Sequence, residues 1–234
     1  MLYVKRDEAL LNLFCEYVKI INNRLKTKEC HRVENKLEQE LLHWSDDILT
    51  FHLPRWSELP EIDLYMDQVV VLSERIFSRF PGTHTGRLIT PSIINNYVKL
   101  GIIPQPVKKK YSRTHIAYLM MICLLKQTLP ILAITDLISY QLESDTIPDI
   151  YNRFCEMQEL ATKVAVQTAR AEYFSTVSQD GENSRSLIEL TLMMAATANS
   201  SKFFAEKVIC LKREKEMLDA ADESSDEDKK AKSK

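Results

Sequence analysis

The spacing of apolar residues is the strongest constraint on the fold of this chain. In residues 4–25, and again in residues 33–51, large apolar side chains recur at steps of three and four. This spacing places side chains on one face of an α-helix, and the strict alternation of a half-buried strand is almost absent. The sequence therefore predicts an all-α, mainly helical fold. Further helices are expected at about residues 63–80, 91–100, 113–127, 130–142, 147–177 and 184–219.

Prolines and a change of composition divide this helical pattern into four parts. Pro54 and Pro60 end the first part, because proline lacks a backbone N–H and biases the preceding residue away from helix. From Asp219 onward the chain has no large apolar residue, so this end cannot bury a core. The expected parts are an N-terminal helical segment (1–55), a central domain (56–143), a C-terminal helical hairpin for dimerisation or effector binding (144–218), and a disordered charged tail (219–234).

The net charge of −2 conceals an uneven distribution of charge along the chain. Residues 75–135 contain no Asp or Glu, and the rest of the chain holds 22 bases against 33 acids. The partner that best matches such a basic stretch is the phosphate backbone of nucleic acid, because each neutralised phosphate releases counterions. The alternative is a solvated basic surface without a partner. The nine bases of this acid-free window are Arg75, Arg79, Arg87, Lys99, Lys108, Lys109, Lys110, Arg113 and Lys126.

The sequence lacks the motifs of several protein classes. Its four glycines do not form either common phosphate-binding loop, and its five cysteines are spread singly, which favours reduced and mostly buried thiols. The histidines do not form a zinc-protease motif, and no G-x-S-x-G occurs. No apolar run of 18 residues is present. We therefore expect a cytoplasmic protein that is not an enzyme and that uses no cofactor, metal or membrane.

The acid-free window also contains a recognisable order of elements. It predicts helix, connection, short helix, proline-marked extended arm, helix and helix, which is the order of a winged helix-turn-helix. The segment from Ile94 to Pro104, with Tyr97, Gly101 and two aliphatic residues, followed by Lys110-Tyr111-Ser112, resembles the DNA-binding region of MerR-type regulators. More closely, residues 53–142 resemble an uncharacterised bacterial domain-of-unknown-function family, number 1836, which is itself regarded as MerR-like.

The resemblance implies roles for particular residues. The helix at 91–100 would enter the major groove, where asparagine can pair with adenine in a bidentate manner. Tyr97 and Tyr111 could instead be core residues, and either asparagine could be a solvated helix residue. The base-reading candidates are Ser92, Asn95, Asn96 and Lys99. The candidates for phosphate or wing contacts are Arg87, Tyr97, Lys108, Lys109, Lys110, Tyr111 and Arg113.

Three departures from the MerR pattern affect the docking of this motif. The arginine that the family usually has at the position of Asn95 is absent, the wing is short or vestigial, and the link between residues 80 and 90 is longer than an ordinary turn. We expect a bacterial transcriptional regulator that binds double-stranded DNA as a homodimer through its C-terminal or N-terminal helices, with an unidentified effector. The alternative is a helical protein–protein adaptor that does not bind DNA.

Overall fold

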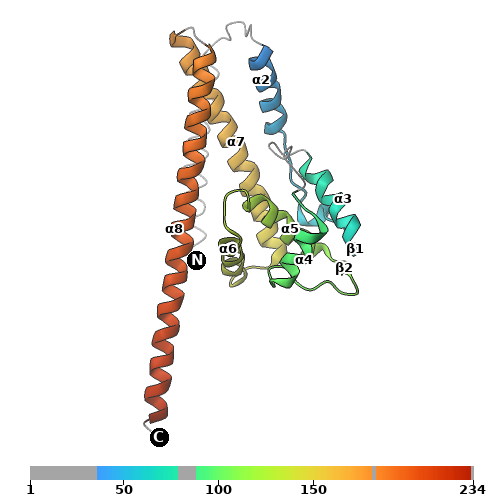
Figure 1. Cartoon of the computed structure of the whole chain (residues 1–234), viewed down its shortest axis with the longest axis vertical. Helices are drawn as coiled ribbons and strands as arrows, with labels where there is room; N and C mark the ends of the chain where they lie inside the picture. The colour runs from blue at the N-terminus through green and yellow to red at the C-terminus, as the bar shows by residue number, and fades with distance from the viewer. Residues whose placement is uncertain (1–35, 79–87, 181–182, 233–234) are drawn as a thin grey trace. The chain divides into compact units, whose positions relative to one another are not determined.

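The computed structural model describes residues 36–78, 88–180 and 183–232, with side chains in 39–78, 88–173 and 187–219. Within these ranges the chain is mostly helical, as the apolar spacing predicts (Figure 1). The predicted helix at 4–25 lies outside the described residues. The helices are α2 (Lys36–Leu49), the 3-10 turn η1 (Trp56–Glu58), α3 (Met66–Phe77), α4 (Pro91–Lys99), α5 (Arg113–Leu125), α6 (Ile131–Leu142), α7 (Ile147–Asp180) and α8 (Asn183–Lys232).

A small antiparallel sheet joins two segments that are far apart in the sequence. It consists of β1 (Leu64–Tyr65) and β2 (Lys110–Tyr111), which lie side by side in Figure 1. Leu64 is opposite Tyr111, and Tyr65 is opposite Lys110. The two strands therefore tie the residues before α3 to the residues before α5.

The described residues fall into two compact units. The first takes in residues 36–59, 71–78, 88, 151–180 and 183–194, and the second takes in residues 60–70, 89–150 and 195–232. The core of the second unit is built around α5. The sequence predicts one apolar face for this helix, with Ile116, Leu119, Met120, Cys123 and Leu124, and all five are buried. His115, Ala117, Met121 and Ile122 are buried as well, so α5 is enclosed on all sides.

The ends of α4 follow from local sequence signals. Thr90 caps the helix, since its side-chain oxygen accepts a hydrogen bond from the backbone N–H of Ile93 at 3.2 Å. Pro91 then occupies the first helical position, where a missing N–H is tolerated. Gly101 follows the helix with φ +71°, a left-handed conformation that glycine adopts without steric cost. These caps match the predicted start and stop of the helix.

A buried ion pair organises the first unit. Glu159, on α7, is buried, and its Oε1 and Oε2 accept hydrogen bonds from Nη1 and Nη2 of the Arg55 guanidinium group, at 2.7 Å and 2.8 Å. It also accepts the backbone N–H of Leu53 at 2.7 Å, and the His52 Nδ1 lies 3.2 Å from its Oε1. Burial alone would raise the pKa of Glu159, but the hydrogen bonds from Arg55 and Leu53 outweigh it and the pKa is lowered. The proline-bounded segment after α2 is thus fixed to α7.

The structure and the sequence-based expectation differ at the C-terminal end. Helix α8 continues to Lys232, through most of the segment for which the composition predicts a disordered tail. Alanine and lysine, which make up seven of the sixteen residues from Asp219 onward, favour helix without the need for a core. No helix in the described ranges is long and apolar enough to cross a lipid bilayer.

Candidate nucleic-acid interface

Helix α4 presents a polar face to solvent and an apolar face to the core of the second unit. Ile94 and Tyr97 are buried, with 0% and 3% of their surface exposed. The four residues predicted to read bases are all exposed, and their spacing of three and four places them on the opposite side of the helix. The structure therefore brings this predicted set together on one face. The four residues are Ser92, Asn95, Asn96 and Lys99.

The turn that follows α4 holds two lysines in an unusual backbone conformation. Lys108 and Lys109 have φ values of 51° and 62°, and the Lys110 N–H donates to the Val107 carbonyl at 2.9 Å. Left-handed geometry at both central residues is that of a type I′ turn, which ordinarily contains Asn-Gly. A side chain with a Cβ costs about 1–2 kcal/mol in that conformation. Strain of this kind, kept at an exposed turn, is a pointer to function.

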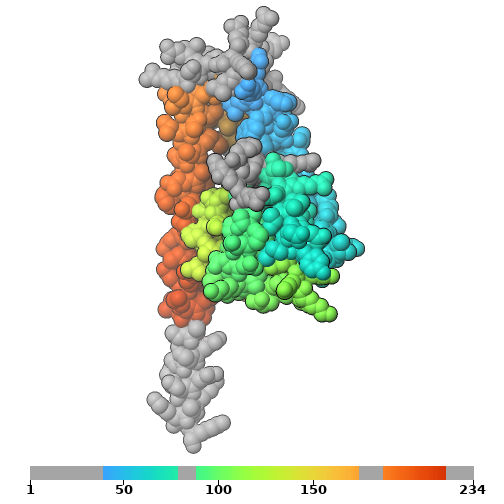
Figure 2. All heavy atoms as spheres, turned by 45° about the vertical axis from the view of Figure 1, so that its right-hand side comes forward, coloured from blue at the N-terminus to red at the C-terminus, as the bar shows by residue number. Residues whose placement is uncertain are grey.

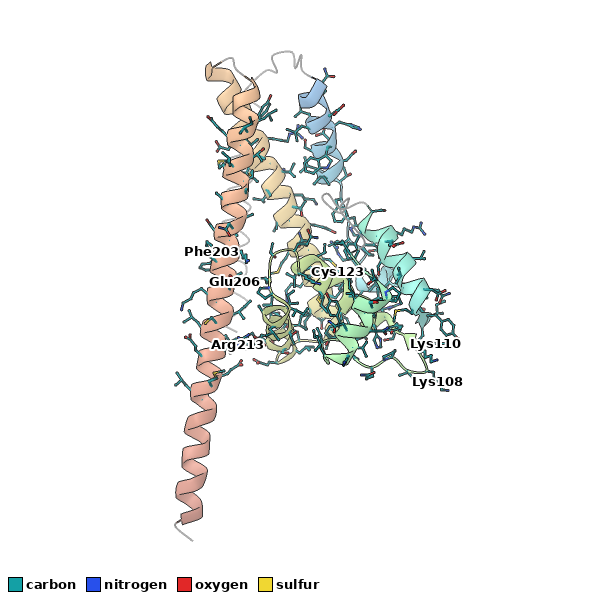
Figure 3. All side chains as sticks on the ribbon, in the orientation of Figure 1. Lys108, Lys110, Cys123, Phe203, Glu206 and Arg213 are labelled. Atoms are coloured by element: carbon teal, nitrogen blue, oxygen red, sulfur yellow. The ribbon has the colours of Figure 1, made fainter. Side chains whose placement is uncertain are left out.

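The turn projects its lysines outward. Lys108 and Lys109 are exposed and Lys110 is partly exposed, and Figure 3 shows Lys108 and Lys110 at the outer end of the loop between α4 and α5. The Lys110 Nζ lies 5.3 Å from the centre of the Tyr65 ring, so the ring stabilises this ammonium group by a cation–π interaction. Residues 107–110 therefore form a tight turn that exposes lysines, and we call this segment the lysine turn.

Two tyrosines that the resemblance assigns to phosphate or wing contacts lie in the core. Tyr97 and Tyr111 are each 3% exposed. The Nζ of Lys126, at the end of α5, lies 5.7 Å from the centre of the Tyr97 ring, and Tyr111 packs edge-on against His115. Burial raises the pKa of Tyr111. These positions agree with the alternative that the sequence left open, in which both rings support the motif from inside.

Of the two remaining candidates for phosphate or wing contacts, Arg113 and Arg87, the structure describes only Arg113. Arg113, the first residue of α5, is mostly buried; its guanidinium lies 3.3 Å from a Glu61 carboxylate oxygen, and its Nε donates to the Pro60 carbonyl at 3.5 Å. It therefore anchors the residues before β1. Arg87 lies outside the described residues.

The surface made by α4 and the lysine turn is rich in unpaired positive charge. In the part of the chain that the structure describes, no ion pair joins Lys99, Lys108 or Lys109 to a carboxylate. The first turn of α4 contains no acid, and Lys99 lies in its last turn. Such a surface attracts polyanions and repels basic partners. We call the exposed face of α4 together with the lysine turn the basic face.

Sequence reasoning missed two residues that position this face. Tyr65 belongs to a two-residue strand that forms only by pairing with β2. The sequence has no alternation of apolar and polar residues that would predict this strand. His115 caps α5 from within, since the Ser112 N–H donates to its Nδ1 at 3.0 Å. The sequence does predict Ser112 as the N-cap of this helix. The signal for the bond from the Ser112 N–H back to His115 is a polar residue three positions after a capping serine.

The described residues contain no cluster of three or more His, Cys, Asp or Glu side chains that could hold a metal ion. The expectation of buried thiols holds for Cys123 and Cys155, and burial raises the pKa of Cys123 to about 12. It does not hold for Cys210, which is exposed on α8. Cys15 and Cys30 lie outside the described residues.

A comparison with protein families gives one match. The family model described as a domain of unknown function (DUF1836) matches residues 54–154, which contain β1, α3, the basic face, α5 and α6. The resemblance to this family is thereby confirmed for that part of the chain. Its description assigns no fold or activity, so the MerR-like winged motif stays a prediction. No curated protein and no solved structure matches the chain.

Proposed function

We propose that this protein is a sequence-specific DNA-binding transcriptional regulator with a MerR-like winged helix-turn-helix. The observation that carries the proposal is the basic face, where a polar, acid-free side of α4 lies in the same unit as a strained and exposed lysine turn. In this proposal α4 enters the major groove of double-stranded DNA and the lysine turn acts as the wing.

The composition of α4 suits direct contact with bases. Its exposed residues combine a hydroxyl, two amides and one ammonium group, which are the donors and acceptors that base edges recognise. Asn95 and Asn96 could each form the bidentate contact with adenine N6 and N7. Ser92 could contact any base, and Lys99 could donate to guanine. A helix needs such a short polar face, with an apolar side packed behind it, to read the groove.

The lysine turn suits the phosphate backbone. Phosphate contacts fix the position and orientation of a protein on the duplex without reading its sequence. Three consecutive lysines at an exposed turn offer compact charges for this role, and Tyr65 fixes the direction of the last one. The left-handed backbone at Lys108 and Lys109 turns the chain within two residues.

The buried residues of the motif act as supports in this proposal. Tyr97 and Tyr111 fasten α4 and β2 to the core, and Arg113 holds the segment before β1 through Glu61. They influence DNA binding by positioning the basic face. We expect the regulator to act as a homodimer, as regulators of the resembled type do, in the cytoplasm of a bacterial cell.

Selection of bound fragments from a random duplex library tests the proposal. The full chain should enrich a common sequence, and the enriched duplex should bind more tightly than a shuffled duplex of equal length. The variant Lys215→Ala, which removes an exposed lysine of α8 outside the basic face, should select the same sequence. Failure to bind any duplex at low salt would contradict the proposal and favour the alternative, a helical protein–protein adaptor.

A further inference from the structure

Leu100, at the C-terminal end of α4, is an apolar residue on the exposed side of a polar helix. It is 58% exposed, whereas Ile94 and Tyr97 of the same helix are buried. Figure 2 shows the green stretch that contains α4 at the surface of the molecule. Leu100 therefore places apolar surface beside the polar groups of the basic face.

Leu100 continues the side of α4 that carries the base-reading candidates. Its backbone is still helical, with φ −79° and ψ −2°, and its N–H donates to the Asn96 carbonyl at 2.9 Å. Residues four apart on a helix lie one above the other on the same side. Leu100 therefore follows Asn96 directly along the exposed side of the helix.

The chain after α4 fixes the position of Leu100 without using its side chain. The Ile102 N–H donates to the Tyr97 carbonyl at 2.9 Å. The Gly101 N–H donates to the Val98 carbonyl at 3.0 Å, and Gly101 has the left-handed φ of +71°. These are the bonds of a Schellman motif, whose apolar contact joins the positions held here by Ile102 and Tyr97. The backbone of Leu100 is thus fixed, while its side chain stays available to a partner.

We propose that Leu100 recognises thymine, by packing its side chain against the 5-methyl group that thymine presents in the major groove. The inference rests on the proposed function, in which α4 enters that groove. Of the four DNA bases only thymine carries a methyl group there, and apolar side chains recognise it by direct contact. The contact is stabilised because the methyl group and the leucine side chain are both removed from water.

The neighbours of Leu100 favour DNA over an apolar protein surface as its partner. Lys99 is exposed next to it, and the first turn of α4 contains no acid. The rest of the exposed side consists mainly of the polar residues Ser92, Asn95 and Asn96. A helix that binds in a protein groove presents several apolar residues at steps of three and four. The exposed side of α4 instead carries one leucine among polar groups, which matches a single methyl group among the polar edges of the bases.

The geometry of α4 also predicts where this thymine lies in the bound sequence. Four residues of α-helix rise about 6 Å along the axis, and neighbouring base pairs are about 3.4 Å apart. The thymine that Leu100 contacts therefore lies within two base pairs of the adenine that Asn96 contacts. This part of the bound sequence should accordingly consist of A·T pairs.

Removal of the methyl group tests the contact without changing the protein. In a duplex selected from the random library, deoxyuridine replaces thymidine at one position at a time, which removes the methyl group and keeps base pairing. At one position the affinity of the full chain should fall about fourfold, the effect expected for one buried methyl group. Leu100→Ala should bind the thymidine duplex more weakly and should bind both duplexes equally. Titration of labelled duplexes provides the measurement.

Leu132→Ala is the matched control, because Leu132 is 69% exposed on α6 of the same unit and lies outside the basic face. This variant should keep the full difference between the thymidine and deoxyuridine duplexes. Both leucines are exposed, so thermal unfolding of both variants should match that of the unmodified chain. In Asn96→Ala, the base pair whose preference is relaxed should lie within two base pairs of the methyl-sensitive thymine.

Two results would overturn the role of Leu100 while DNA binding itself holds. One is a set of deoxyuridine duplexes that all bind as tightly as the thymidine duplex. The other is a Leu100→Ala variant that still distinguishes the two duplexes, which would assign the methyl contact to another residue. Absence of binding to any duplex at low salt would instead contradict the proposed function, and the recognition of thymine with it.

Discussion

Arg55 in the first unit and Lys108 in the second carry the same charge in opposite surroundings. Arg55 is held by two hydrogen bonds to the buried Glu159, and those bonds raise its pKa further above the ordinary arginine value. Lys108 extends from an exposed turn in a stretch of 61 residues without an acid. The contrast separates charge that stabilises the fold from charge that is available to a partner. Substitutions at the two places should therefore affect different measurements.

The largest effect is expected from the lysine turn. Replacing Lys108, Lys109 and Lys110 together by alanine removes three phosphate contacts, and affinity for every duplex should fall about 1000-fold at low salt. Thermal stability should be nearly unchanged, because none of the three pairs with a carboxylate in the described residues. Titration of a labelled duplex measures the affinity. An equal loss in Lys215→Ala would contradict the assignment.

The buried ion pair should show the reverse behaviour. Glu159→Gln leaves Arg55 without its counter-charge, and removal of one partner of a buried pair costs about 3 kcal/mol in the free energy of unfolding. Chemical denaturation gives this value. The matched control is Glu143→Gln, which removes an exposed carboxylate that pairs with Lys212 and should cost under about 1 kcal/mol. Similar costs for the two variants would contradict the structural role of Glu159.

The same pair predicts the pH dependence of stability. The pKa of Glu159 is lower in the folded chain than its ordinary value of 4.5. The ionised form therefore stabilises the fold fully above that value, and this contribution is lost as the pH falls through the folded pKa. The difference in stability between the unmodified chain and Glu159→Gln should shrink as acid is added. Unfolding midpoints measured from neutral to acidic pH provide the test, and a constant difference would contradict it.

A smaller effect, of a different kind, is expected on α4. Asn95→Ala should change which sequences are preferred, with a loss of discrimination of about 1–3 kcal/mol at one base pair. Its affinity for non-specific duplex should hardly change, since Asn95 carries no charge. Repeated fragment selection with the variant measures this preference. If the variant weakens all sequences equally, as the lysine variant should, Asn95 does not read a base.

The smallest effect is expected from relief of backbone strain. Lys109→Gly should stabilise the fold by about 1 kcal/mol, because glycine adopts a φ near 62° without steric cost. Affinity for DNA should fall several-fold through the loss of one charge. Lys109→Arg is the matched control, since it keeps both the charge and the strain. Thermal unfolding and duplex titration of the two variants would separate the contributions, and a glycine variant of unchanged stability would contradict the account of strain.

The sequence predicted the elements whose signals are local. Thr90, Pro91 and Gly101 marked both ends of α4, and Ser112 marked the start of α5, because capping depends on residues within one turn. The residues of the exposed face of α4 were named from the resemblance to MerR-type regulators. Apolar spacing gave only one buried face for α5, since burial on all sides depends on the elements that surround it.

Other features could not be read from local patterns. The strand at Leu64–Tyr65 exists through its pairing with Lys110–Tyr111, which is distant in the sequence. A left-handed backbone conformation is unfavourable for lysine, so the sequence did not predict the positive φ angles of Lys108 and Lys109. The sequence did not decide whether Tyr97 lies in the core or on the surface, because its burial depends on the packing of the whole unit. Each of these features depends on tertiary structure.

The salt dependence of duplex binding tests the central claim most directly. If the three lysines of the lysine turn each contact a phosphate, the logarithm of the association constant should fall with the logarithm of salt concentration with a slope of about −3 per protomer. The triple alanine variant of the lysine turn should bring the slope close to zero. A slope that is the same in the two proteins, or no binding of the unmodified chain at low salt, would contradict the claim that this face binds DNA.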